Sequence, residues 1–192
     1  MVKLAYKYNI DALSMLLLRM LFAFPFYVVI AYYYRNEAKE DTTRKDLVWL
    51  VFFGFVGYYL ASYFDFVGLT YIKASLERII LFIYPTIVLL FNKWFLKRHI
   101  TTNQKLAILI TYVGIIVTFG SEVQLSGNDT YLGGFFVLLS AITYASYLVG
   151  SGWLIPKFGV MRFTAYAMLV SCLCVFVHYG LFSRVDIYNY PW

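Results

Sequence analysis

Six long apolar runs dominate the chain, and they constrain its fold more than any other feature. A membrane-spanning helix needs roughly 20 mainly apolar residues, and the run at 105–121 is the shortest of the six. Only 14% of the residues are charged, whereas a soluble domain carries about 25%. We therefore predict an all-α integral membrane protein, a polytopic bundle of about six transmembrane helices with no soluble domain. The runs are 13–34, 47–72, 76–96, 105–121, 131–155 and 163–182.

The basic residues indicate how the bundle is oriented. The loops after the first, third and fifth runs carry ten Lys and Arg residues, against four on the other side. Because Lys and Arg collect in cytoplasmic loops, both ends of this chain are predicted to be extracytoplasmic. The net charge of +6 then has a topological role, and we expect no nucleic acid partner.

The run at 131–155 is rich in small residues, which let helix backbones approach closely in lipid. We therefore predict that this helix packs centrally in the bundle. Two prolines, Pro25 and Pro85, lie inside apolar runs and each removes a backbone hydrogen bond. Each is expected to kink its helix, either beside a cavity or as a plain structural bend. The small residues that form pairs four positions apart are Ala141, Ala145, Ser146 and Gly150.

Four ionisable residues lie within or at the ends of the apolar runs: Arg19, Asp65, Glu77 and Arg78. The predicted orientation places all four in the outer half of the bilayer. A charge near the bilayer centre costs about 2.5–3.5 kcal/mol, so such residues usually face the protein interior. They are candidates for a charged gate or substrate anchor, or else for ion pairs that fix helix packing. Arg19 and Asp65 are the deeper two and form the predicted pair.

Aromatic residues supply the other candidates for a substrate cavity. Tyr58, Tyr84, Tyr144 and Tyr147 could line such a cavity together with Pro85, although most of the 19 tyrosines must be packing or interfacial residues. Neither a nucleophile–base pair nor a phosphate-binding glycine loop is present, so we predict no catalytic residues, metal or cofactor. The two cysteines lack metal-ligand spacing and are expected to be packing residues.

Four sequence segments, taken in order and spacing, resemble the EamA-like family of the drug/metabolite transporter superfamily. The string from Asp65 to Arg78 is the longest, and Pro85 lies within another. They are Asp11 to Leu13 with Leu18 to Pro25, Asp65 to Arg78, Tyr84 to Thr86, and Gly133-Gly134 with Ser140 to Ala145.

This resemblance implies a ten-helix transporter built from two inverted five-helix repeats, with the substrate cavity between them. The six runs then correspond to helices two to seven. Residues 1–121 would be a first repeat lacking its first helix, 131–192 would be the start of the second, and the chain would be truncated. The implied function is secondary transport, by export or exchange, of a small metabolite, amino acid or drug.

The expected partners are a small-molecule solute and the lipid bilayer, with a homodimer left open. The expected location is the bacterial inner membrane. The alternative function is that of a non-transporting membrane scaffold or a partner subunit.

Overall fold

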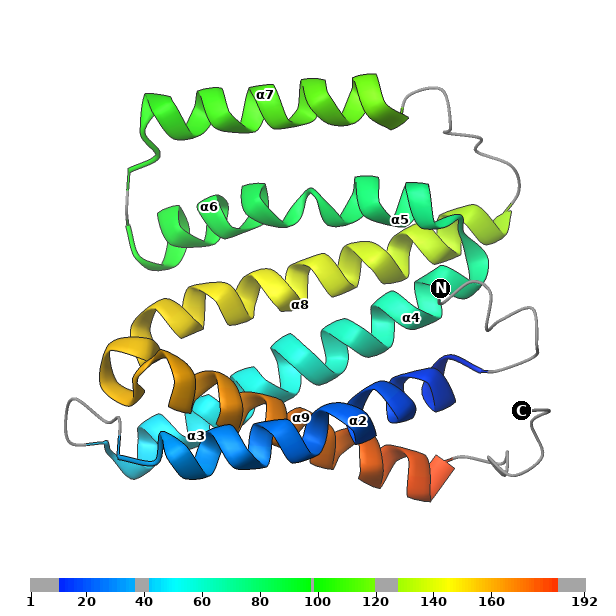
Figure 1. Ribbon diagram of the computed structural model, residues 1–192. Helices are drawn as coiled ribbons and strands as arrows, with labels where there is room; N and C mark the ends of the chain where they lie inside the picture. Colours follow the sequence, from blue (N-terminus) through cyan, green and yellow to red (C-terminus); the bar gives the residue numbers. More distant parts are fainter. Residues whose placement is uncertain (1–10, 37–41, 98, 120–127, 183–192) are drawn as a thin grey trace.

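The computed structural model describes residues 11–36, 42–97, 99–119 and 128–182, and throughout these ranges every regular element is helical (Figure 1). Within these ranges, five helical spans are long and apolar enough to cross a membrane, and Thr102–Val117 forms a shorter apolar helix. These elements confirm the prediction of an all-α polytopic membrane protein. The helices are α2 (Ala12–Tyr33), α3 (Arg44–Gly54), η1 (Phe55–Leu60), α4 (Ala61–Tyr71), α5 (Ala74–Leu81), α6 (Tyr84–Phe95), α7 (Thr102–Phe119), α8 (Asn128–Phe158) and α9 (Val160–Phe182).

One transmembrane helix contains a wide turn. The elements α3, η1 and α4 form a single span, Arg44–Tyr71, in which η1 is π-helical. A π-bulge inside an α-helix is frequently found at functional sites. The span begins at a capping box, in which Thr43 and Asp46 satisfy each other's backbone donors.

The predicted run 76–96 is two helices and not one. The helix α5 ends at Leu81, and α6 begins at Tyr84 with Pro85 in its first turn. Proline suits this position because its missing N–H would have no partner there in any case. The other predicted kink site, Pro25, lies inside α2, which the structure assigns as one uninterrupted helix.

The helix α8 is central, as the small residues predict. It contacts α3, η1, α4, α5, α6 and α9, and it runs through the middle of the bundle in Figure 1. Ala141 and Ala145 are fully buried, and the Ser140 hydroxyl donates to the Ala61 carbonyl at 2.7 Å. A methyl group added at Gly68 would lie 2.5 Å from Val137 Cγ2, so α4 and α8 approach too closely there for any side chain.

The helices form layers that can be followed in Figure 1. The helix α7 lies at one edge next to α5 and α6, whereas α2 and α9 lie at the opposite edge. A tight link joins α8 to α9 through Gly159, whose φ of 81° favours glycine. Residues 120–127, between α7 and α8, lie outside the described residues.

Candidate functional site

Four of the predicted tyrosines form one continuous row. Tyr84 of α6 meets Tyr144 of α8 edge-on, with ring centroids 5.5 Å apart. Tyr144 stacks on Tyr147 at 6.0 Å, and Tyr147 meets Tyr58 of η1 at 4.7 Å. Offset and edge-to-face ring pairs at these spacings are the favoured arrangements. The tyrosine row therefore crosses from the first half of the chain into the second through directly contacting rings.

The wide turn η1 positions the end of this row. A side chain at Gly57 would overlap the Tyr147 side chain, so the Tyr147 ring packs directly on bare backbone. This approach brings the Tyr58 and Tyr147 hydroxyls to 2.9 Å. On its other side Tyr147 stacks on Phe163 of α9 at 5.9 Å. Tyr147 is consequently held from three directions.

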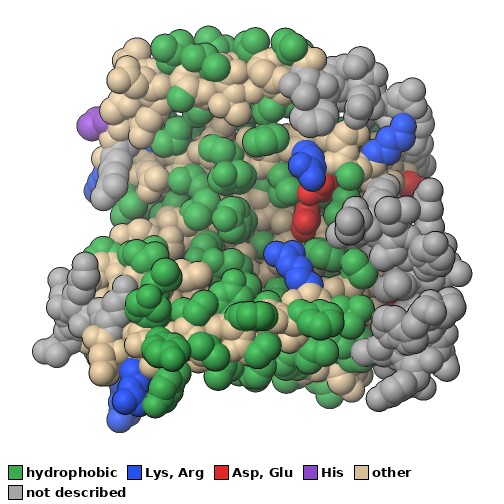
Figure 2. All heavy atoms as spheres, in the orientation of Figure 1, with side chains coloured by type: hydrophobic (Ala, Val, Ile, Leu, Met, Phe, Trp, Pro, Cys, Tyr) green, Lys and Arg blue, Asp and Glu red, His purple; other side chains and the backbone are tan. Residues whose placement is uncertain are grey.

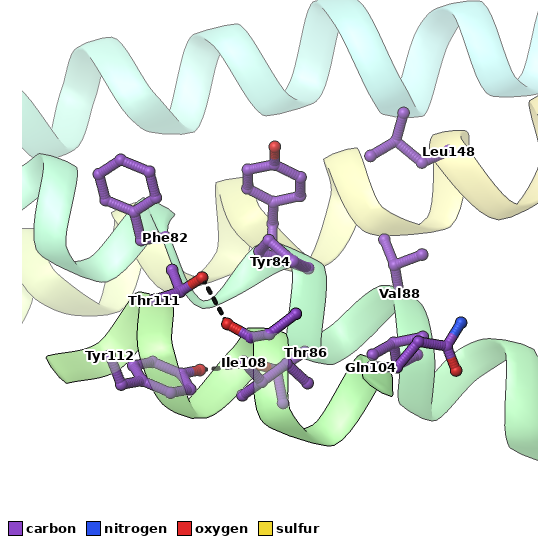
Figure 3. Close-up of a pocket in the computed structure, with 12 residues that line it drawn as sticks. Phe82, Tyr84, Thr86, Val88, Gln104, Ile108, Thr111, Tyr112 and Leu148 are labelled. Carbon is purple, nitrogen blue, oxygen red and sulfur yellow. Dashed lines mark hydrogen bonds between the residues drawn. The ribbon is translucent and has the colours of Figure 1, made fainter. Parts of the chain in front are cut away.

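A cavity of about 350 Å³ lies beside the tyrosine row, between α6 and α7. Figure 3 shows Tyr84 between Phe82 and Val88 on one side of it, with Thr111 and Tyr112 coming from α7. Pro85 also lines this cavity. The lining is mainly apolar, and the Tyr112 hydroxyl lies 2.8 Å from the Thr86 hydroxyl. An apolar wall with a few placed polar groups is the usual form of a small-molecule site.

The sequence analysis missed the residues that α7 gives to this cavity. Gln104, Thr111 and Tyr112 line it, yet the run at 105–121 was interpreted only as a short span. Their spacing along α7 gives no strong signal, since Thr111 and Tyr112 are neighbours in the sequence. Only the packing of α7 against α5 and α6 brings them to the Tyr84 side.

The four predicted charged residues also come together, but with different partners from those expected. The Asp65 and Glu77 carboxyl groups lie close enough to influence each other, and Arg19 and Arg78 are the neighbouring positive charges. Glu77 is only 8% exposed, and Oδ1 of Asp65 is buried with no hydrogen-bond partner among the described residues. We call these four residues the charged cluster.

The predicted Arg19–Asp65 salt bridge is therefore not formed. The only salt bridge within 4.0 Å between described residues lies elsewhere, and the Arg19 guanidinium lies 5.9 Å from the centre of the Phe66 ring. The reason is the chain reversal at Ile72 and Lys73, which places the first turn of α5 beside α4 and so brings Glu77 to Asp65. Acidic and basic side chains grouped in this way interrupt the hydrophobic face seen in Figure 2.

The charged cluster and the tyrosine row occupy successive levels of the same helices. Asp65 lies seven residues after Tyr58 along one helical span, and Glu77 lies seven residues before Tyr84. At 1.5 Å per residue each separation is about 10 Å. The candidate site is thus a row of aromatic hydroxyls with the charged cluster toward one end of the bundle.

A second tyrosine of η1 makes a polar contact on the opposite side of the helix. The Tyr59 hydroxyl lies 2.6 Å from Nδ1 of His178 on α9, and the Tyr63 ring lies 5.1 Å from the same imidazole. Cys172, buried against Met20 of α2, is a packing residue as expected.

An ion pair that the sequence analysis missed lies at the other end of the helices. Lys157 Nζ lies 2.7 Å from Oδ1 of Asp46. The sequence conceals this pair, because 111 positions separate the two residues. The one available signal was the Thr43 to Asp46 spacing of a capping box, which places Asp46 inside the first turn of a helix.

Comparisons with known proteins agree with this architecture. Residues 1–120 match the EamA-like transporter family. The chain is also 29% identical over 186 residues to the protein described as "Uncharacterized transporter YcbK" of Bacillus subtilis (strain 168), an alignment that covers 97% of this chain and 60% of that relative. No solved structure matches the chain.

Proposed function

Because this chain belongs to the EamA-like transporter family, we propose that it moves a small organic solute across the membrane as a secondary transporter. The solute classes we propose are amino acids, other metabolites and drugs, carried by export or exchange. The observation that carries the proposal is the tyrosine row, because it joins helices from both halves of the chain. A transporter of this kind needs its solute site between two parts that can move against each other.

The geometry suits a solute with an apolar body and an ionised group. The tyrosine rings offer faces for the apolar body, and their hydroxyls offer hydrogen bonds. The charged cluster, about 10 Å farther along the helices, supplies both signs of charge to an ionised group. We propose Arg19, Asp65, Glu77 and Arg78 as the gate or anchor for that group, and Tyr58, Tyr84, Pro85, Tyr144 and Tyr147 as cavity residues.

The chain spans about 60% of the length of its Bacillus relative, so the activity of a whole transporter is part of the proposal. We propose residues 1–121 as a partial first repeat and 131–192 as the first two helices of a second, inverted repeat. Both ends of the chain would face the extracytoplasmic side of a bacterial inner membrane. We also propose a homodimer as the assembly.

Flux measurement in lipid vesicles tests the proposal. The protein is reconstituted, a pH or solute gradient is imposed, and uptake is followed for labelled amino acids and other small metabolites. Tyr58→Phe deletes a hydroxyl that pairs with Tyr147, at a net value of about 0.5–1.5 kcal/mol. We therefore expect solute affinity to fall about two- to tenfold. Tyr131→Phe, at a position 72% exposed, is the matched control and should leave uptake unchanged.

Absence of flux for every solute under both gradients would contradict the transporter proposal. The alternative function is that of a membrane scaffold or partner subunit. It predicts that the protein co-purifies from membranes with one partner in fixed stoichiometry. A transporting protein that purifies without such a partner excludes this alternative.

A further inference from the structure

The Asp46–Lys157 ion pair is unusually well built for the end of a membrane bundle. The Asp46 side chain is only 4% exposed and that of Lys157 26%. Oδ1 of Asp46 accepts from Lys157 at 2.7 Å, while its Oδ2 accepts from the Thr43 backbone N–H at 3.0 Å. Both carboxylate oxygens are therefore satisfied. A buried charge with this degree of pairing is held in one geometry.

The pair joins the two halves of the chain at the end away from the charged cluster. Asp46 lies in the first turn of α3, and Lys157 lies in the last turn of α8, two residues before the Gly159 link. The contact is reinforced by rings: Lys157 Nζ lies 5.0 Å from the centre of the Trp153 ring, and Trp153 meets Trp49 of α3 at 6.1 Å. The carboxyl groups at the opposite end, Asp65 and Glu77, pair within the first half.

We propose that Asp46 and Lys157 form a gate, which closes this end of the solute path and separates when that end opens. The inference rests on the proposed transport function. The tyrosine row lies between this gate and the charged cluster. A solute that leaves the tyrosine row toward Lys157 therefore passes between α3 and α8. The ion pair and the Trp49–Trp153 contact block that passage.

The physical chemistry of an ion pair suits a gate. When the two helices are together, the pair is partly shielded from water and the attraction is strong. When they part, water enters and solvates both charges, and an exposed pair in water contributes little. The ion pair is therefore stable while the gate is closed, and separating it costs little free energy once water has entered. Removing one partner alone is different, because it leaves the other charge unpaired in the closed state and so favours opening.

A cysteine-accessibility experiment tests the gate without a transported solute. In a background with Cys172→Ala and Cys174→Ala, Ser151→Cys is the reporter, since Ser151 is 7% exposed and lies between Tyr147 and Lys157 on α8. The reconstituted protein is exposed to a hydrophilic maleimide from either side. Asp46→Asn keeps the acceptor for Thr43 and removes only the charge. We expect it to raise the Ser151→Cys labelling rate about tenfold, the effect of a 1.4 kcal/mol shift toward the open state.

Three further variants make the result specific. Lys157→Gln should raise labelling as Asp46→Asn does, whereas Lys157→Arg should leave the reporter protected. Combining Asp46→Lys with Lys157→Asp should restore protection in part, because the swap rebuilds the pair but loses the cap on Thr43. Lys45→Gln removes a charge from the exposed position next to Asp46 and should not alter labelling.

A second reporter distinguishes gating from loosening of the whole bundle. Val137 is fully buried near the other end of α8. A Val137→Cys reporter should therefore stay protected from the maleimide when Asp46→Asn is added. Equal labelling of both reporters, or no change at Ser151→Cys, would overturn the gate. If Asp46→Asn raises labelling at Ser151→Cys in a protein that moves no solute, the transport proposal is refuted, but the opening of this end of the bundle is supported.

Discussion

The contact between Gly57 and Tyr147 predicts a large effect for the smallest possible side-chain addition. A methyl group at Gly57 would overlap Cβ and Cγ of Tyr147 and lie 2.9 Å from its Cδ2. The Tyr147 ring cannot retreat, because it stacks on Phe163 and bonds to Tyr58. Overpacking of this kind costs about 1–3 kcal/mol, whereas replacing glycine by alanine in a helix gains up to about 1 kcal/mol. We expect Gly57→Ala to be destabilising by about 1–2 kcal/mol.

The same substitution at Gly152 is the matched control. A methyl group there would meet nothing within 4 Å, so Gly152→Ala should be neutral or slightly stabilising. Unfolding in mixed micelles, followed by tryptophan fluorescence, measures both variants against the parent protein. Adding Tyr147→Leu to Gly57→Ala should recover part of the lost stability by opening space for the methyl group. Equal stability of Gly57→Ala and Gly152→Ala would refute the close-packed arrangement at the wide turn.

Two other predictions concern polar pairs. A double-mutant cycle of Asp65→Asn with Glu77→Gln should show coupling above about 0.5 kcal/mol, as expected for groups in contact, while Asp65→Asn with Arg19→Gln should be closer to additive. If unfolding measurements gave a larger coupling energy for Asp65 with Arg19 than for Asp65 with Glu77, they would support the Arg19–Asp65 pair instead. Thr86→Val and Tyr112→Phe should each cost about 0.5–1.5 kcal/mol. Their combination should cost less than the sum, and full additivity would show that the two hydroxyls do not pair.

The sequence predicted the helices well because the bilayer leaves few choices for an apolar run of this length. Their starts and ends were displaced by only a few residues, as the span Asn128–Phe158 against the expected 131–155 shows. The break between α5 and α6 was foreseeable at Pro85 only as a kink. Whether a proline bends a helix or begins a new one depends on the packing around it, which the sequence does not state.

The sequence analysis named residues that the structure brings together, but it did not predict which of them contact each other. Tyr144 and Tyr147 lie three residues apart on α8, so a shared face follows from helical periodicity alone. The contact of Tyr147 with Tyr58 required η1, and a wide turn leaves no pattern in the residue types. Depth in the bilayer suggested Arg19 as the partner of Asp65, and the reversal before α5 brings Glu77 near Asp65 as well. The Asp46–Lys157 pair was hidden by its sequence separation.

The wide turn at Phe55–Leu60 also sets the phase of the whole span. In a regular α-helix, side chains at positions 46 and 65 would point about 100° apart. A π-bulge inserts one extra residue and so cancels that offset, which brings Asp46 and Asp65 onto the same line along the helix. Deleting one residue of η1 would restore the regular winding and turn one of these two carboxylates by about 100° relative to the other. The length of this segment is therefore as much a part of the site as its side chains.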